Sequence, residues 1–238
     1  MRRRRLRRRR WSDVANGSLP FEDRRAAGRA LASALTEFGD SRPLVLALPR
    51  GGVPVGYEVA NAIGGDLDVL LVRKLGAPGH EELGIGAIVD GDPPQVILNQ
   101  QVLAQVVLPS GYIHNESKRQ LVELERRRSA YLGARAHVPV KGRTVIVVDD
   151  GIATGGTMRA ALRGVRQKQP ARLVLAVPVA PRDSIEALAG ECDDIVCLHT
   201  PQPFYAVGAH YRDFTQTTDE EVRELLAIAT GLEPSAMI

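Results

Sequence analysis

Short apolar runs alternate with longer amphipathic segments along most of this chain. The runs predict buried strands at 44–48, 67–72, 145–148, 173–177 and 195–198. Apolar residues at helical spacing, with helix-start signals at the last segment, predict helices at 21–38, 53–63, 112–132, 158–165, 184–189 and 218–229. Segments 85–89 and 95–98 flank a turn-forming stretch and predict a β-hairpin. This order favours an α/β protein with a doubly wound, mainly parallel sheet.

Three of the predicted strands are followed by residues with binding chemistry. They are Arg50-Gly51-Gly52, Arg73-Lys74 and Asp149-Asp150. Ligands of open α/β sheets gather beyond the carboxyl ends of the strands. We therefore expect these three groups, which come from distant parts of the sequence, to meet at one edge of the sheet.

Residues 145–157 form the most informative motif. A β-branched strand ends at Asp149 and Asp150, and a loop of Gly and Thr residues then opens a helix. Ionised carboxylates only accept hydrogen bonds, so they suit sugar hydroxyls. Backbone N–H groups at a helix start, together with Thr hydroxyls, favour a phosphate. The motif therefore predicts a ligand with a diol at one end and a phosphate at the other.

This motif resembles the loop that binds 5-phosphoribosyl-1-diphosphate (PRPP) in type I phosphoribosyltransferases. Its amino-acid sequence is most similar to the version found in adenine phosphoribosyltransferases. The resemblance implies that the two aspartates hold the ribose 2′- and 3′-hydroxyls and that residues 153–157 hold the 5′-phosphate. It also implies the type I phosphoribosyltransferase fold with a small hood or hairpin insertion. The expected PRPP-binding residues here are Asp149, Asp150, Gly151, Ile152, Ala153, Thr154, Gly155, Gly156 and Thr157.

The pyrophosphate end of the ligand is assigned to the two other strand ends. Arg50, Gly51 and Gly52 resemble the family's pyrophosphate loop, in which a cis peptide bond would fall between Arg50 and Gly51. Arg73 and Lys74 follow the next predicted strand, and the resemblance implies that Lys74 reaches the leaving pyrophosphate. Mg²⁺ prefers substrate phosphates and water to an all-protein cage, so we expect it to arrive with PRPP. Asp213 is the one further candidate for a metal ligand.

The stretch 75–84 is rich in Gly and Pro and is predicted to be a mobile loop, like the family's flexible catalytic lid. Glu81, Glu82 and His80 are its candidates for the acid or base of the reaction, and the residues do not decide among them.

The acceptor is assigned to an aromatic segment, 203–214. Phe204 or Tyr205 would lie against a planar acceptor, because aromatic faces stack on bases. Ala153 stands where hypoxanthine-guanine enzymes carry a proton-transferring Asp. This difference favours adenine or another amino-bearing heterocycle as the acceptor.

The chain also resembles a little-described subgroup of predicted phosphoribosyltransferases between about residues 20 and 228. Two segments that carry this resemblance are Phe21-Glu22-Asp23-Arg24 and Tyr211-Arg212-Asp213-Phe214. The sequence assigns no role of their own to Arg24 and Tyr211. Some relatives are fused to a hydrolase domain, but no Gly-x-Ser-x-Gly motif occurs in this chain.

Composition mainly limits the alternatives. The formal charge of +3 is dominated by eight arginines within residues 2–10; the rest of the chain is mildly acidic, so its charge gives no reason to expect nucleic-acid binding. With two cysteines and no signal peptide or membrane span, the sequence predicts a cytoplasmic protein. We expect a disordered tail (1–19), a phosphoribosyltransferase domain (20–230) and a C-terminal tail (231–238).

The resulting functional hypothesis is a Mg²⁺-dependent phosphoribosyltransferase of nucleotide salvage, expected to be a homodimer. It would transfer phosphoribose from PRPP to a nitrogenous base or related nucleophile and release pyrophosphate. The main alternative is a PRPP-sensing regulator that binds nucleic acid through the Arg tract, and a further one is a hydrolase that uses water as the acceptor.

Overall fold

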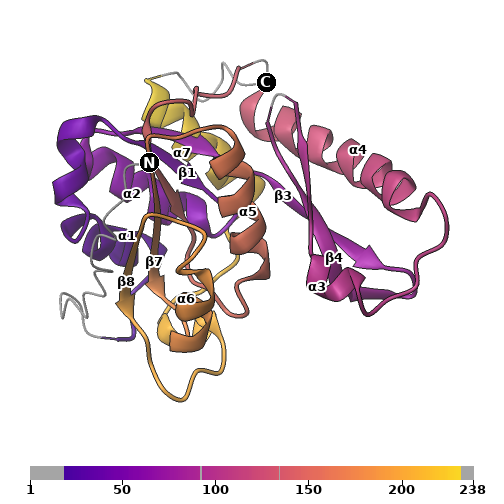
Figure 1. Ribbon diagram of the computed structural model, residues 1–238. Coiled ribbons are helices and arrows are strands. Elements are labelled where there is room, and N and C mark those ends of the chain that lie inside the picture. Colours follow the sequence, from indigo (N-terminus) through magenta and orange to yellow (C-terminus); the bar gives the residue numbers. More distant parts are fainter. Residues whose placement is uncertain (1–18, 92, 134, 232–238) are drawn as a thin grey trace, which may run out of the picture.

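The computed structural model describes residues 19–91, 93–133 and 135–231. Its centre is a five-stranded parallel sheet in the order β2-β1-β6-β7-β8, which confirms the predicted α/β class (Figure 1). The strands are β1 (Leu44–Ala47), β2 (Asp66–Val69), β6 (Thr144–Val148), β7 (Arg172–Val179) and β8 (Asp194–His199). The helices around this sheet are α1 (Arg24–Ser33), α2 (Gly52–Ile63), α5 (Gly156–Gln167), α6 (Arg182–Leu188) and α7 (Asp219–Thr230).

A smaller part of the molecule lies beside α5 (Figure 1). It consists of a three-stranded antiparallel sheet in the order β3-β4-β5, with β3 (Val72–Ala77), β4 (His80–Val89) and β5 (Gln95–Leu98). Helices α3 (Gln100–Leu103) and α4 (Tyr112–Leu132) follow it. Two short 3₁₀ segments, η1 (Thr36–Ser41) and η2 (Val207–His210), complete the described elements. The hairpin predicted from 85–89 and 95–98 is the β4–β5 pair of this smaller part.

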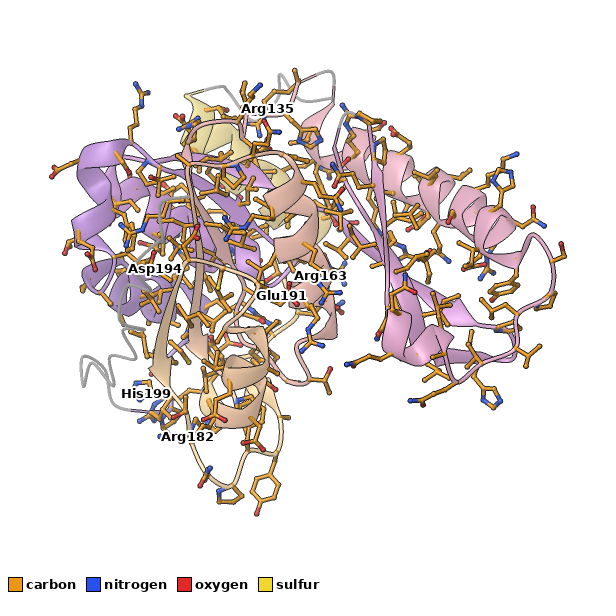
Figure 2. All side chains as sticks on the ribbon, in the orientation of Figure 1. Arg135, Arg163, Arg182, Glu191, Asp194 and His199 are labelled. Carbon is orange, nitrogen blue, oxygen red and sulfur yellow. The ribbon has the colours of Figure 1, made fainter. Side chains whose placement is uncertain are left out.

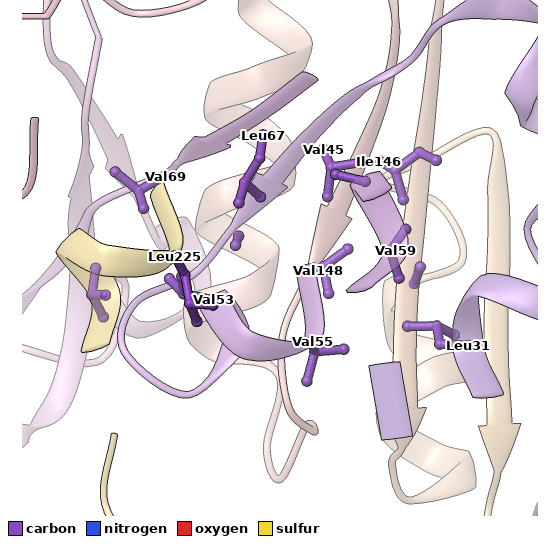
Figure 3. Close-up of a cluster of buried hydrophobic side chains, with 14 of the residues drawn as sticks. Leu31, Val45, Val53, Val55, Val59, Leu67, Val69, Ile146, Val148 and Leu225 are labelled. Carbon is purple, nitrogen blue, oxygen red and sulfur yellow. The ribbon is translucent and has the colours of Figure 1, made fainter. Parts of the chain in front are cut away.

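The two faces of the parallel sheet bury different side chains because strand residues alternate between faces. Val45, Ile146 and Val148 pack with α1, α2 and α7 in one cluster, which Figure 3 shows from close by. Leu46 and Val147 pack on the opposite face with residues of α5 and α6. The continuous apolar runs of the sequence therefore belong to strands that are covered on both faces.

Two expectations about the region after β2 are wrong. The strand predicted over 67–72 ends at Val69, and Val72 already begins β3 of the second sheet. The stretch predicted as a loop, 75–84, is instead a pair of antiparallel strands joined at Pro78-Gly79, where Gly79 has a φ of 72°. An unbroken apolar run carries no face signal, so it cannot show where the chain leaves one sheet for the other.

The first predicted helix is shorter than its apolar pattern. The Asp23 side chain accepts a hydrogen bond from the Ala26 N–H and thereby caps α1, and the helix ends at Ser33. Three apolar residues of the pattern lie beyond this end: Ala34 and Leu35 follow the helix, and Phe38 belongs to η1. The predicted range of α4 is identical to the observed one.

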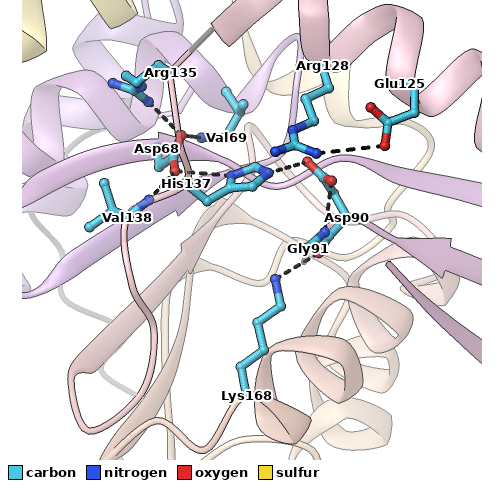
Figure 4. A network of polar contacts seen from close by, with 10 residues as sticks. All are labelled: Asp68, Val69, Asp90, Gly91, Glu125, Arg128, Arg135, His137, Val138 and Lys168. Carbon is cyan, nitrogen blue, oxygen red and sulfur yellow. Dashed lines mark hydrogen bonds and ion pairs between the residues drawn. The ribbon is translucent and has the colours of Figure 1, made fainter. Parts of the chain in front are cut away.

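A buried network of charged residues joins the two sheets (Figure 4). Asp68 of β2 accepts hydrogen bonds from Arg135 Nη2 at 2.6 Å and from the Val138 N–H at 3.0 Å. His137 lies between two carboxylates, with Nδ1 3.3 Å from Asp68 and Nε2 2.9 Å from Asp90, which follows β4. Lys168, at the end of α5, donates to the Asp90 carbonyl at 2.8 Å.

This network predicts alkaline sensitivity of the fold. Hydrogen bonds to Asp68 and then Asp90 raise the pKa of His137 from 6.5 to about 9, so its stabilising charge is complete below pH 6.5 and is lost as the pH rises through 9. We expect His137→Gln to lower the free energy of unfolding by about 2–3 kcal/mol at neutral pH and much less near pH 10. Urea unfolding of both proteins across this range measures the difference. Comparing the two proteins at each pH removes the contribution of Lys168, whose pKa is lowered by burial.

The matched control for this prediction is His114→Gln, because His114 is exposed on α4. It should leave the unfolding free energy unchanged at every pH. A His137 variant whose deficit is the same at pH 7 and pH 10 would contradict the charged role of this histidine.

Candidate active site

The predicted binding loops meet where the strand order of the parallel sheet reverses. Strands β1 and β6 are neighbours there, with Ala47 paired to Val148, and the Leu48 N–H donates to the Val148 carbonyl at 2.9 Å. The Arg50–Gly52 segment follows β1, and the aspartate pair follows β6. Such a reversal is the usual ligand site of doubly wound sheets.

Glycines allow the two loops to touch. A Cβ on Gly52 would lie 2.9 Å from the Val148 carbonyl oxygen and 3.2 Å from Asp149 Oδ1. A Cβ on Gly51 would collide with Asp150 Oδ2. The start of α2 therefore packs directly against both carboxylates. The cis peptide bond of this loop is Pro49–Arg50, one position earlier than expected.

The loop between β6 and α5 is fixed by neighbouring elements. The Ile152 N–H donates to the Val179 carbonyl at 3.0 Å, and the Ser184 hydroxyl of α6 donates to the Ala153 carbonyl at 2.6 Å. Gly155 has a φ of 77° and precedes the first residue of α5. Thr154 and Thr157 stay exposed at the helix start. This arrangement leaves the backbone N–H groups and hydroxyls available to an anion.

Asp149 and Asp150 are both half-buried. Burial, and then the charge of Asp150, raise the pKa of Asp149 well above its usual value. Burial also raises the pKa of Asp150, although the Arg24 guanidinium opposes this effect. Asp149 Oδ1 accepts the Asp150 N–H at 2.9 Å, which orients the first carboxylate. Two desolvated acceptors side by side suit a diol, which donates a hydrogen bond to each.

A cavity of about 410 Å³ connects the predicted phosphate loop, residues 153–157, to the small sheet of β3, β4 and β5. Thr154, Gly156 and Thr157 line it on one side, and Lys74 of β3 lines it on another. The exposed lysine side chain extends along Gly84 of the facing strand β4. The structure therefore brings Lys74 to the same cavity as the phosphate loop, although it lies within a strand rather than after one.

Arg73 and Arg50 are held by other residues. Arg73 Nε donates to Gln120 of α4 at 3.0 Å, and burial followed by the charge of Arg127 lowers its pKa. Arg50 Nη1 lies 3.6 Å from Asp219 of α7. Asp219 also accepts the Tyr131 hydroxyl at 2.6 Å, and burial together with this bond raises the pKa of Tyr131 to about 12.

The lid candidates and the aromatic segment lie in separate places. His80 begins β4, and Glu81 and Glu82 follow it in the same strand. Phe204 is half-buried and lies 5.1 Å from the His210 ring, whereas Tyr205 is 84% exposed. Neither aromatic residue lines the cavity that Lys74 shares with the phosphate loop.

The described residues hold no group of three or more His, Cys, Asp or Glu side chains that could bind a metal ion. Asp213 is exposed and accepts hydrogen bonds from the N–H and hydroxyl of Thr215 at 2.9 and 2.6 Å, which lower its pKa. The carboxylate of Asp213 thus organises a local turn. No helix in the described ranges is long and apolar enough to cross a membrane.

Sequence reasoning missed two side chains at this site. Arg24 Nε donates to Asp150 Oδ2 at 2.8 Å, and the Tyr211 hydroxyl donates to the Asp150 carbonyl. Both belong to segments that carry the family resemblance, but neither residue received a role of its own from the sequence. Their spacing from Asp150 gave no local signal of contact.

The fold and the site define the class of this protein. It is an α/β protein whose candidate ligand site lies at the carboxyl edge of a doubly wound sheet. Comparison with known proteins is more specific: the family model described as "Phosphoribosyl transferase domain" matches residues 22–207. The chain belongs to the phosphoribosyl transferase domain family.

Individual relatives agree with this assignment. The chain is 46% identical over 202 residues to "Putative phosphoribosyl transferase Rv0571c" of Mycobacterium tuberculosis strain H37Rv. The match covers 85% of this chain and 45% of that protein, so the chain spans about half the length of this curated relative. The crystal structure of TT1426 from Thermus thermophilus is similar with a TM-score of 0.78 and 46% identity, over 87% of this chain and 98% of TT1426.

Proposed function

We propose that this protein, with Mg²⁺, transfers the phosphoribosyl group of PRPP to a nitrogenous base or related nucleophile and releases pyrophosphate. The observation that carries the proposal is the meeting of a half-buried acid pair, the Gly51-Gly52 loop and the helix-start loop of residues 153–157 near the β1–β6 reversal. These three features match three groups of PRPP. The acid pair matches the ribose diol, the Gly51-Gly52 loop the pyrophosphate, and residues 153–157 the 5′-phosphate.

In this proposal the side chains mainly position and stabilise charge. Asp149 and Asp150 accept the ribose hydroxyls, and residues 153–157 hold the 5′-phosphate. The nucleophile forms a bond to C1 as the C1–oxygen bond to pyrophosphate breaks, and pyrophosphate leaves with that electron pair. Lys74 stabilises the negative charge that develops on the leaving oxygen, while the N–H groups at the start of α2 bind the pyrophosphate.

The residues at the site fit a metal that comes with its substrate. Mg²⁺ prefers substrate phosphates and water to an all-protein cage. In this proposal the phosphates of PRPP carry the metal, and Asp149 and Asp150 are left for the ribose hydroxyls. When bound, the metal would neutralise charge on the pyrophosphate. His80, Glu81 and Glu82 remain the proposed acid or base candidates for the acceptor proton.

Titration of the full chain with PRPP, with and without Mg²⁺, tests the proposal. We expect saturable binding that Mg²⁺ strengthens, together with pyrophosphate release when an accepted acceptor is added. Absence of PRPP binding under both conditions would overturn the proposal. Light scattering on the same sample tests the expected homodimer.

The choice of acceptor is a separate prediction. Ala153 leaves the phosphate loop without a proton carrier for a 6-oxopurine, so we expect adenine or another amino-bearing heterocycle to react faster than hypoxanthine or guanine. Hydrogen bonds must supply this preference, because stacking contributes only about 1–3 kcal/mol and discriminates poorly. Competition among adenine, hypoxanthine, guanine, uracil and orotate, followed by pyrophosphate release, measures it.

Faster turnover of hypoxanthine or guanine than of adenine would contradict this preference. PRPP binding without turnover of any of the five would favour a regulator, or an enzyme with a different acceptor. Pyrophosphate release without any acceptor would favour hydrolysis.

A further inference from the structure

Segments 21–24 and 211–214 lie side by side next to Asp150. Phe21 and Tyr211 form a parallel bridge, in which the Arg212 N–H donates to the Phe21 carbonyl at 2.8 Å. The Asp213 N–H donates to the Glu22 carbonyl at 2.9 Å. The start of α1 and the C-terminal segment therefore form one unit, although nearly the whole domain separates them in sequence.

Arg24 is the residue that connects this unit to the acid pair. Its Nε donates to Asp150 Oδ2 at 2.8 Å, and its Nη1 donates to the Thr215 carbonyl at 2.7 Å. The guanidinium carbon lies 3.9 Å from the centre of the Phe214 ring. The Arg24 side chain is only 11% exposed, so these contacts fix it in one position.

The carboxylate of Asp150 is in turn held from several sides. Arg24 contacts it from α1, and Gly51 of the proposed pyrophosphate loop packs against the same oxygen. The Tyr211 hydroxyl fixes the Asp150 carbonyl from the C-terminal segment. Arg24 uses one of the roughly four acceptor positions of the carboxylate, which leaves others for a ligand.

We propose that Arg24 is a positioning residue for PRPP, which holds the Asp150 carboxylate aimed at a ribose hydroxyl. This inference rests on the proposed function. Burial favours protonation of Asp150, and a protonated carboxyl is a poorer acceptor for a hydroxyl. The guanidinium supplies the opposing charge without occupying the whole carboxylate.

The electrostatics of the site agree with this geometry. Burial raises the pKa of Asp150, and both the hydrogen bond and the charge of Arg24 lower it. The other groups that face this carboxylate are Asp149 at the end of β6 and Tyr211, whose pKa is raised chiefly by burial. Asp213 lies close enough to Arg24 to interact with its charge. Arg24 is the cation that contacts Asp150 among the described residues.

The test is the affinity of Arg24→Gln for PRPP with Mg²⁺, measured by calorimetric titration of the full chain at pH 6 and pH 8. We expect binding about 10- to 100-fold weaker than that of the wild-type protein at pH 8, the loss typical of a charged hydrogen bond. The loss should be larger at pH 6, because Asp150 without its cation protonates more readily. Comparing variant with wild type at each pH removes the titration of PRPP itself.

Two further variants separate positioning from folding. Arg24→Lys keeps the charge but not the fork, so it should lose less affinity and by the same factor at both pH values. Arg25→Gln is the matched control on the same helix, since Arg25 pairs with Glu58 at 2.6 Å and lies over the Tyr57 ring. It should bind PRPP like the wild-type protein at both pH values.

Each outcome decides the inference. Equal or tighter PRPP binding by Arg24→Gln, or a loss that does not depend on pH, would overturn the role of Arg24 and leave the proposed function intact. If Arg24→Gln does not fold, Arg24→Lys decides alone. A loss of PRPP affinity in Arg24→Lys that is greater at pH 6 than at pH 8 would overturn the inference. Failure of the wild-type protein to bind PRPP would overturn both proposals.

Discussion

Replacing Asp149 and Asp150 together by Asn should weaken PRPP binding by about 10²- to 10⁴-fold. Each substitution removes a charged hydrogen bond to a ribose hydroxyl, worth about 1.5–3 kcal/mol. The fold should survive, because burial raises the pKa of both carboxylates, which means that the folded chain disfavours their charges. Calorimetric titration with PRPP and Mg²⁺ measures the affinity, and thermal unfolding checks the fold.

A second pair of adjacent aspartates provides the control. Asp193 and Asp194 lie at the amino end of β8, opposite the edge that carries the site, and pair with Arg166 and Arg172. In Figure 2, Asp194 lies far from His199 at the other end of the same strand. Asp193→Asn with Asp194→Asn should leave PRPP affinity unchanged within about twofold, since this pair lies at the opposite end of the strands from the proposed PRPP site. Equal PRPP affinity of the two double variants would show that Asp149 and Asp150 do not bind PRPP.

The parallel sheet and the loop between β6 and α5 were predictable because their signals are local. Buried strands of a doubly wound sheet appear as continuous apolar runs, and Val145 to Val148 is such a run with a clear end at Asp149. The alternation of strands and helices then determines which ends share an edge. The motif and the strand order together bring the Gly51 loop and the acid pair into contact before any side chain is considered.

The small sheet was less predictable because its signals conflict. Leu70 and Leu71 continue the apolar run of β2, yet the chain changes sheet at this point. Gly76 and Gly84 favour a loop, but they pair with each other across β3 and β4. Tertiary pairing outweighs the low strand propensity of glycine here. The mobile-lid interpretation therefore becomes a β-hairpin that carries Lys74, while its mobility stays a prediction.

The contacts of Arg24 lay beyond sequence reasoning for a different reason. Its partner Asp150 is 126 residues away, and Thr215 is 191 residues away. Periodicity and capping report only on neighbours within a few turns. The sequence also treats both aspartates as ordinary ionised carboxylates, whereas burial raises the pKa of each. The protonation balance of the site is therefore a property of the folded chain, set by desolvation against one guanidinium.

Replacing Lys74 by Ala should lower turnover by about 10²- to 10³-fold while changing PRPP affinity much less. A cation aimed at charge that develops in the transition state contributes to kcat more than to binding. Lys74 is the lysine of β3 that lines the same cavity as Thr154 and Thr157, two residues of the proposed 5′-phosphate loop. Steady-state pyrophosphate release with an accepted acceptor gives kcat and the KM for PRPP separately.

Lys118→Ala is the matched control, because Lys118 is an exposed lysine on α4. It should leave both constants unchanged, since an exposed charge away from the cavity contributes little to the reaction. Wild-type turnover in Lys74→Ala would exclude Lys74 from the departure of pyrophosphate. A rise in KM with unchanged kcat would instead make Lys74 a residue that binds PRPP and its transition state equally. The charge on the leaving group would then have to be stabilised from the β1–α2 side of the site, by the Gly51-Gly52 loop and the metal.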